Sequence, residues 1–193
     1  MRKLLTCVVP ISLATCAIGI AAQPAAAAGT CFDAPDSHTA TYSFDPKTGI
    51  TTAIGTPGDD VIIGHDDLDL ILGKGGNDRI CALKIDDSVR GGPGDDKIGG
   101  GQGIDSLWGG PGNDLILGYS HADHIVGGNG EDVLEGGAAA DRILGGSGND
   151  QLLGGQGDDK LDGDNAAPTY GFGGGDSCDG GKGVNRLLNC ELP

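Results

Sequence analysis

The stretch GGPGNDLIL, residues 109–117, is one unit of a nine-residue pattern that repeats twelve times over residues 55–162 without insertion or deletion. Gly occupies the first position of every unit except the fourth, which has Ala82. The sixth position is always Asp, and its members are Asp60, Asp69, Asp78, Asp87, Asp96, Asp105, Asp114, Asp123, Asp132, Asp141, Asp150 and Asp159. The eighth position is always aliphatic, and its members are Ile62, Ile71, Ile80, Val89, Ile98, Leu107, Ile116, Ile125, Leu134, Ile143, Leu152 and Leu161.

A fixed repeat of this length is typical of a solenoid, because a unit of nine residues cannot bury its own apolar side and must stack on copies of itself. The first six positions supply Gly where a tight turn needs positive φ, and a carboxylate where the turn closes. The last three positions suit a short strand whose middle side chain points to one side and whose flanking side chains point to the other. The sequence therefore predicts an all-β fold with a narrow core.

The pattern resembles GGxGxDxUx, with U aliphatic, the signature of the RTX or haemolysin-type calcium-binding nonapeptide-repeat family, over more than half of the chain. The resemblance implies a parallel β-roll, a β-solenoid with two units per coil, strands on two faces and turns on two edges. It also implies Ca²⁺ between each turn and the turn one coil later. The implied ligands are the sixth-position Asp of both turns and backbone carbonyls of the Gly-rich segments, which are the oxygen ligands that Ca²⁺ prefers.

Alternate units fall on opposite edges of such a roll, and the two sets differ. The odd-numbered units keep the signature, whereas four of the six even-numbered units replace the fourth-position Gly, by Asp67, Ile85, His121 and Ala139. A side chain there restricts the turn and crowds its carbonyls, so we expect the calcium ladder along the odd-numbered turns. The expected ligands are Asp60, Asp78, Asp96, Asp114, Asp132 and Asp150, with the carbonyls that the resemblance implies at Gly92, Gly94, Gly110, Gly112, Gly128, Gly130, Gly146 and Gly148.

Three further aspartates are candidates. Asp176 lies in GFGGGDSCD, residues 171–179, which resumes the register after an insertion at 163–170 and offers a sixth site between turns. Among the even-numbered turns the best pair is Asp141 and Asp159. The alternative for all of these residues is a solenoid whose Asp side chains only make hydrogen bonds within turns.

The predicted core is thin, while a Gly-rich backbone loses much conformational entropy on folding. Stacked carboxylates would lie about one strand spacing, ~4.8 Å, apart and repel one another. Bound cations remove this repulsion. The sequence therefore predicts that calcium binding and folding are one event.

The segments outside the repeats have their own roles. Residues 1–28 read as a secretory signal peptide, with two basic residues, an apolar stretch and an Ala-rich end, although 13–16 loosely resembles a lipoprotein cleavage box. Residues 29–54 are expected to cap the first coil and to contain a β-hairpin. Residues 163–193 are expected to hold the insertion, two degenerate repeats and a C-terminal cap. A secreted, extracellular protein follows from this organisation.

Charge limits the partners. The net charge is −16, and removal of Arg2 and Lys3 with the signal peptide makes it −16 − 2 = −18. A chain this acidic attracts cations and is not expected to bind nucleic acid or anionic membranes directly. We expect a single slender domain and a monomer.

Four cysteines remain after signal removal, and an exported protein meets an oxidising environment. Three pairings are possible. We favour Cys31 with Cys81, which joins the cap to the third unit, and Cys178 with Cys190, which closes the tail. Zinc held by the four cysteines is the alternative, but no CxxC spacing supports it.

No catalytic signature accompanies the repeats: the sequence has neither HExxH nor GxSxG, so we expect no enzyme. The turn His121–His124 reads HADH, and its two histidines are either solvated or a transition-metal pair. The ninth-position residues Trp108, Val126 and Leu144 would form an exposed apolar row suited to a protein or cell-wall partner, although strands favour such residues in any case. The remaining alternative is a calcium-binding or buffering protein without a partner.

Overall fold

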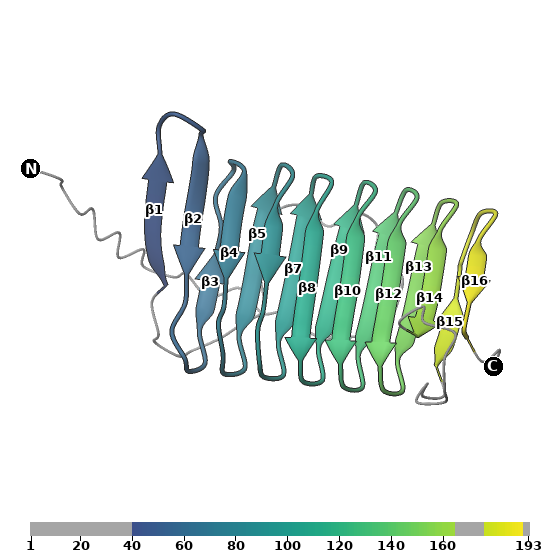
Figure 1. Cartoon of the computed structure of the whole chain (residues 1–193). Coiled ribbons are helices and arrows are strands. Elements are labelled where there is room, and N and C mark those ends of the chain that lie inside the picture. Colours follow the sequence, from purple (N-terminus) through teal and green to yellow (C-terminus); the bar gives the residue numbers. More distant parts are fainter. Residues whose placement is uncertain (1–39, 165–175, 191–193) are drawn as a thin grey trace, which may run out of the picture.

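The computed structural model describes residues 40–164 and 176–190. This part of the chain consists of strands and turns, arranged as two sheets that stack along one long axis (Figure 1). The seven-stranded sheet contains β3 (Val61–Ile63), β5 (Arg79–Lys84), β7 (Lys97–Gln102), β9 (Leu115–Ser120), β11 (Val133–Ala138), β13 (Gln151–Gln156) and β15 (Ser177–Asp179). The nine-stranded sheet contains β1 (Thr41–Asp45), β2 (Ile50–Ile54), β4 (Asp69–Leu72), β6 (Ser88–Arg90), β8 (Ser106–Pro111), β10 (His124–Asn129), β12 (Arg142–Ser147), β14 (Lys160–Asp164) and β16 (Arg186–Leu188).

Each strand of the repeat region pairs in parallel with the strand one coil away. Ile116 of β9 lies between Ile98 of β7 and Leu134 of β11, eighteen residues to either side. Consecutive units therefore alternate between the two sheets, and two units complete a coil. The predicted parallel β-roll is confirmed. No helix that could cross a membrane occurs in the described segments.

The core consists of the eighth-position side chains, which face one another between the sheets. All twelve aliphatic residues of this position are at most 2% exposed. The central strands are six residues long rather than three, because the first positions of the next unit also pair, as Gly101 does with Tyr119. The thin core and long hydrogen-bond ladders agree with the expectation from the sequence.

The first coil begins earlier than the repeat pattern indicated. β1 and β2 form an antiparallel hairpin, and β2 then pairs in parallel with β4. Thr51 lies beside Asp69 in the aspartate column, and Ala53, fully buried, lies beside Ile71 in the core column. Residues 46–54 are therefore one more unit, whose signature residues are replaced by smaller ones.

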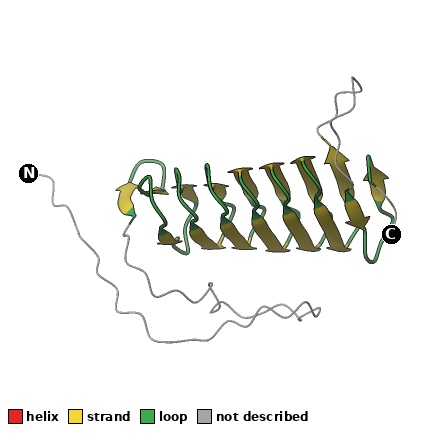
Figure 2. Ribbon diagram, turned by 90° about the horizontal axis from the view of Figure 1, so that it is seen from below, coloured by secondary structure: helices red, strands yellow, loops and turns green. Residues whose placement is uncertain are grey.

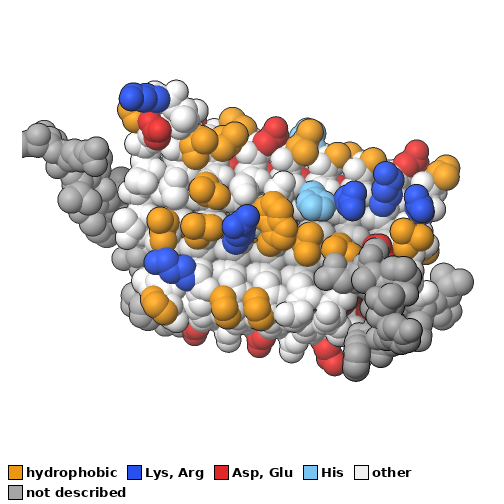
Figure 3. Space-filling view, in the orientation of Figure 1, with side chains coloured by type: hydrophobic (Ala, Val, Ile, Leu, Met, Phe, Trp, Pro, Cys, Tyr) orange, Lys and Arg blue, Asp and Glu red, His pale blue; other side chains and the backbone are white. Residues whose placement is uncertain are grey.

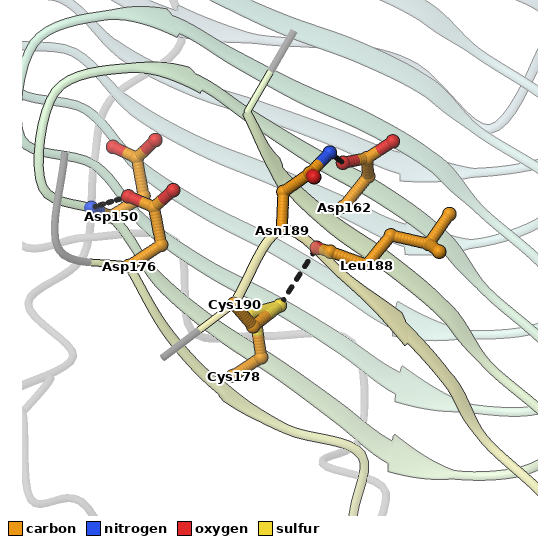
Figure 4. The surroundings of a disulfide bond; sticks show 7 residues. All are labelled: Asp150, Asp162, Asp176, Cys178, Leu188, Asn189 and Cys190. Carbon is orange, nitrogen blue, oxygen red and sulfur yellow. Dashed lines mark hydrogen bonds between the residues drawn. A yellow bond between two sulfur atoms is a disulfide. The ribbon is translucent and has the colours of Figure 1, made fainter. Parts of the chain in front are cut away.

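The C-terminal end resumes the register after the insertion, as expected. Cys178 of β15 lies beside Leu152 of β13, in the core column. A disulfide joins Cys178 to Cys190, with 5.7 Å between the α-carbons (Figure 4), which confirms this predicted pair. Cys81 is also disulfide-bonded.

Several expectations fall outside the part of the chain that the structure describes. Cys31 is among these residues, so the Cys31–Cys81 pairing stays a prediction. The same holds for the signal peptide at 1–28, for residues 29–39 of the cap and for residues 165–175 of the insertion and the degenerate repeat.

Candidate metal centre

The turns form two rows, one along each edge of the roll. The odd edge consists of the turns that lead into the seven-stranded sheet, and the even edge consists of the turns that lead into the nine-stranded sheet from β4 onward. Seen from below, the two sheets lie on either side of a row of turns (Figure 2). The sixth position closes each turn, so the aspartates of alternate units collect on opposite edges.

From Asp78 and Asp87 onward, one oxygen of each aspartate carboxylate accepts a hydrogen bond from the neighbouring turn. The Asp96 N–H donates to Asp114 Oδ1 at 2.8 Å, and the Asp114 N–H donates to Asp132 Oδ1 at 2.8 Å. The even edge repeats this geometry, since the Asp105 N–H donates to Asp123 Oδ1 at 2.8 Å. The row continues through the C-terminal unit, where the Asp150 N–H donates to Asp176 Oδ1 at 2.9 Å (Figure 4). The structure thus brings the predicted aspartates into two continuous ladders.

The second carboxylate oxygen is the informative atom. Twelve repeat aspartates are at most 3% exposed, and a buried carboxylate oxygen without a hydrogen bond is costly. Such an oxygen, with no donor among the described residues, occurs on the odd edge at Asp60, Asp78, Asp96, Asp114 and Asp132. It occurs on the even edge at Asp69, Asp87, Asp105, Asp123, Asp141 and Asp159.

Burial makes the charged form of these carboxylates costly. It raises the pKa of Asp96 to about 7, and the neighbouring carboxylates of Asp114 and Asp78 add to the rise, while the hydrogen bond from the Asp78 N–H lowers it. On the even edge burial raises the pKa of Asp123 to about 8, with Asp105 and Asp141 adding to the rise. A divalent cation beside the ladder would offset both causes.

Backbone carbonyls supply further oxygen atoms at the same place. A β-carbon at Gly110 would lie 2.2 Å from the carbonyl oxygen of Gly92, and one at Gly112 would lie 2.1 Å from that of Gly94. Second-position and fourth-position carbonyls thus point at the α-carbon of the following turn, where only Gly fits. In the described residues no backbone N–H donates to the carbonyl of Gly94, Gly112 or Gly130. These carbonyls are free to act as ligands.

The donor set is the kind that Ca²⁺ takes: carboxylate and carbonyl oxygens without nitrogen or sulfur. No group of three His, Cys, Asp or Glu side chains converges in the described part of the chain. Side chains alone therefore make no complete site, and carbonyls must contribute. The residues present fit calcium on these terms. The His124 ring lies edge-on against Trp108, with centroids 6.0 Å apart.

The two edges differ in backbone conformation at the fourth position. On the odd edge φ is 135° at Gly94, 137° at Gly112, and 135° at both Gly130 and Gly148. On the even edge φ falls to 71° at Ile85, 75° at His121 and 88° at Ala139. Only Gly adopts the larger values without strain, and φ sets the direction of the adjoining peptide groups. The odd edge therefore has four consecutive turns of one shape, while the even edge mixes turns of this shape, with φ 140° at Gly103 and 138° at Gly157, with turns of smaller φ.

The odd edge also has a second, outer ladder at the fifth position, which the sequence did not lead us to expect. The Asp95 N–H donates to Asn77 Oδ1 at 2.9 Å, the Asn113 N–H to Asp95 Oδ1 at 2.8 Å, and the Glu131 N–H to Asn113 Oδ1 at 2.8 Å. The recurrence of Asp or Asn at this position in GTPGDD, GKGGND, GGPGDD and GGPGND was the available signal. A cavity of about 320 Å³ lies along this ladder, between Asp59 and Lys97.

The even edge carries apolar residues at its turn tips. Leu68, Ile85 and Ile104 are 41%, 50% and 57% exposed. In the space-filling view many apolar side chains lie along the upper edge, with acidic side chains among them (Figure 3). Both edges share the inner aspartate ladder, but only the odd edge combines it with uniform Gly turns and a continuous outer polar ladder. The even edge has isolated outer bonds, from the Ile104 N–H to Asp86 Oδ1 and from the Val184 N–H to Asp158 Oδ1.

Comparison with known proteins agrees with the geometry. The family model described as RTX calcium-binding nonapeptide repeat matches in four copies, at residues 47–80, 86–107, 99–134 and 135–167. No curated protein and no solved structure matches the chain. The matched segments cover more than half of the sequence, begin in the unit that precedes Gly55 and end after β14. This chain belongs to the RTX calcium-binding nonapeptide repeat family.

Proposed function

We propose that the protein is a secreted, non-catalytic calcium-binding β-roll that folds outside the cell as Ca²⁺ binds between the stacked turns of its odd edge. One observation supports the bound cation: a buried carboxylate oxygen without a hydrogen-bond donor recurs at every coil from Asp60 to Asp132. The even edge has such oxygens too, and it is the uniform Gly turns that favour the odd edge for calcium. A fold that leaves the same buried acceptor unsatisfied in each coil needs a repeating cation.

The aspartates and the glycines of each turn have different roles at the proposed site. From Asp78 to Asp141, each sixth-position Asp uses Oδ1 to hold the backbone of the preceding coil and leaves Oδ2 without a hydrogen bond, as Asp114 does between Asp96 and Asp132. Gly94, Gly112 and their equivalents allow adjacent turns to approach and present carbonyls there. When bound, Ca²⁺ would supply positive charge that neutralises the carboxylates of successive coils.

The site exists only when two coils are stacked, because its ligands come from turns eighteen residues apart. The unfolded chain has no such site, so binding energy contributes directly to folding. An exported chain would then remain unfolded where calcium is scarce and fold where calcium is abundant.

The test is far-UV circular dichroism of the oxidised protein, titrated from excess chelator to millimolar calcium, with Trp108 fluorescence followed in parallel. We expect a cooperative transition from coil to β structure that magnesium does not reproduce, because Mg²⁺ demands a smaller and more regular site. A protein with full β structure in chelator would contradict the coupling of folding to calcium.

A second function, contact with a cell surface or matrix, is favoured by the outer side of the nine-stranded sheet. Val126 lies between Trp108 and Leu144 in register, which makes an apolar row. Arg90 Cζ lies 5.5 Å from the centroid of the Trp108 ring, so the ring is held in place. We define these three residues, Trp108, Val126 and Leu144, as the apolar row.

The test of this second function is sedimentation of the calcium-folded protein with cell-wall or matrix preparations. Trp108→Ala should reduce the bound fraction, whereas Leu117→Ala, on the opposite sheet, should not. Equal binding of both variants would leave calcium binding or buffering as the only activity.

A further inference from the structure

A row of basic side chains follows the apolar row on the same face of the roll. Arg142 of β12, Lys160 of β14 and Arg186 of β16 are neighbours in parallel register, and His124 of β10 precedes them. Adjacent strands lie about 4.8 Å apart, so the charges form a closely spaced line along the long axis. Figure 3 shows Lys and Arg side chains beside a His toward the C-terminal end of this face. We call Arg142, Lys160 and Arg186 the basic row.

Folding does not explain the basic row. All three side chains are exposed, and no carboxylate lies within ion-pair distance of any of them in the described part of the chain. Like charges directly opposite one another on neighbouring strands destabilise a sheet. The protein has only 12 Lys and Arg against 28 Asp and Glu, so three unpaired cations in one line are unexpected from composition.

The neighbouring acidic group on this face has another partner. Asp162 lies two residues after Lys160 on β14, and its Oδ1 accepts a hydrogen bond from Asn189 Nδ2 at 2.7 Å (Figure 4). Burial and then the charge of Arg142 lower the pKa of His124. At neutral pH the positive charge of the line therefore resides on Arg142, Lys160 and Arg186.

The apolar row, on β8, β10 and β12, and the basic row, on β12, β14 and β16, follow one another along this face and overlap on β12. Val126 and Leu144 stand two residues after His124 and Arg142 on the same strands, and side chains two residues apart share a face of a sheet. A ligand that lies along this face meets the apolar row, including the Trp108 ring, over β8 to β12 and the cations over β12 to β16. The spacing and polarity of the two rows restrict what that ligand is.

We propose that this face binds a linear acidic polysaccharide that lies along the roll, with its carboxylate or sulfate groups on Arg142, Lys160 and Arg186 and its sugar rings on the apolar row. The proposal rests on the second function given above and names its partner. Each repeat of such a polymer carries an anionic group and an apolar C–H face on its sugar ring. The anionic group matches the basic row, and the C–H face matches the apolar row.

Other polyanions fit less well. An extended acidic peptide places side chains of one face about 6.6 Å apart, two residues at ~3.3 Å each, which falls out of step with a row at ~4.8 Å. Nucleic acid carries a much denser line of charge, with one phosphate per ~1.7 Å of duplex, than a row of cations spaced at ~4.8 Å. The net charge of −16 opposes every polyanion. Calcium bound at the turns would reduce that negative charge, so we expect polysaccharide binding by the calcium-loaded form.

The experiment uses the oxidised full chain, folded in saturating calcium at physiological salt, with short dextran sulfate as the probe and uncharged dextran of the same length as its control. Binding is measured by titration calorimetry, and circular dichroism verifies that each variant is folded. We expect dextran sulfate to bind and dextran not to bind. The double variant Arg142→Gln/Lys160→Gln should weaken binding about 30-fold, because each cation at an anionic surface contributes about fivefold to the affinity.

The matched control is Lys47→Gln/Lys74→Gln, which removes the same charge from exposed positions outside this face. It should change the affinity less than about twofold, because charges beyond a Debye length are screened. If the double variant Arg142→Gln/Lys160→Gln folds poorly, the single variant Lys160→Gln replaces it. Lys160→Arg, which keeps the charge, should then bind like the wild type.

The proposal would be overturned by no binding of dextran sulfate by folded protein, by equal losses in the two double variants, or by tighter binding of polyglutamate than of dextran sulfate. These failures are distinguishable from failure of the calcium function, because binding is measured on protein already shown to be folded. The proposal would also be contradicted if Trp108→Ala lost binding while Arg142→Gln/Lys160→Gln kept it. That result would assign the face to an uncharged partner.

Discussion

The odd and even edges of this roll share one aspartate ladder but differ in the turns that carry it. Asp114 on the odd edge and Asp123 on the even edge are equally buried, and each accepts an N–H at 2.8 Å from the Asp one coil earlier. The fourth-position φ is 137° at Gly112 but 75° at His121. Stacking of the coils therefore needs only the sixth-position Asp, while a regular arrangement of the turn carbonyls also needs Gly at the fourth position.

The largest effect is expected from removing that Gly. In Gly112→Ala the new β-carbon would lie 2.1 Å from the Gly94 carbonyl oxygen at a φ that Ala does not tolerate. We expect a loss of about 3 kcal/mol of stability in calcium and a strongly raised calcium requirement, measured by chemical unfolding and by calcium titration.

The matched change on the even edge is Ala139→Gly. Ala139 has φ 88°, so Gly relieves strain there while adding freedom to the unfolded chain. The two effects oppose each other, and stability should stay within about 1 kcal/mol of the wild type. A large loss in this variant would mean that the even turns are not the more tolerant ones.

The next comparison separates the contribution of calcium to stability from that of the hydrogen bond. Asp114→Ala and Asp123→Ala each remove one N–H···O bond of 2.8 Å, so that loss, about 1 kcal/mol, is common to both. Asp114→Ala should in addition lower the number of bound calcium ions and raise the calcium concentration at the folding midpoint severalfold. The two variants are compared by the same titration, and equal midpoints would refute a ladder confined to the odd edge.

Protons should partly replace calcium in its absence. Burial raises the pKa of Asp114 to about 6 and that of Asp123 to about 8, above the ordinary value of 3.8. The folded state then binds more protons than the unfolded state between about pH 4 and pH 8, so stability falls as pH rises through this window. In chelator, acidification from pH 8 to pH 5 should increase β structure by circular dichroism. A gain of β structure on raising the pH would contradict this sign.

Much of this was accessible from the sequence, because the period is rigid. The aspartate and aliphatic columns and the return of Asp176 to register follow from the nine-residue period. The Cys178–Cys190 disulfide was the favoured one of the possible pairings because it closes the tail. The unit at 46–54 escaped notice because Thr51 and Ala53 stand where Asp and an aliphatic residue are diagnostic. A side chain at the fourth position was expected to restrict the turn, yet Ile85 adopts a positive φ. The stacked neighbours impose the turn, and the cost appears as strain rather than as a different fold.

The smallest effect concerns the outer ladder, which only the three-dimensional stacking revealed. Asn113→Ala removes the acceptor of the Glu131 N–H, a bond of 2.8 Å on the exposed side of the turn. We expect a loss of about 1 kcal/mol in calcium, measured by thermal unfolding. Ala122→Asn places an amide at the equivalent position of the even edge and should change stability by less than about 0.5 kcal/mol.

The most direct test of a calcium ladder on one edge is the number of calcium ions bound at saturation, counted by equilibrium dialysis of the folded protein. Six aspartates from Asp60 to Asp150 enclose five gaps between turns, and Asp176 adds a sixth. Our account predicts five or six strongly bound ions. About twice that number would show that both edges bind calcium alike, and none would show that the buried carboxylates have another role.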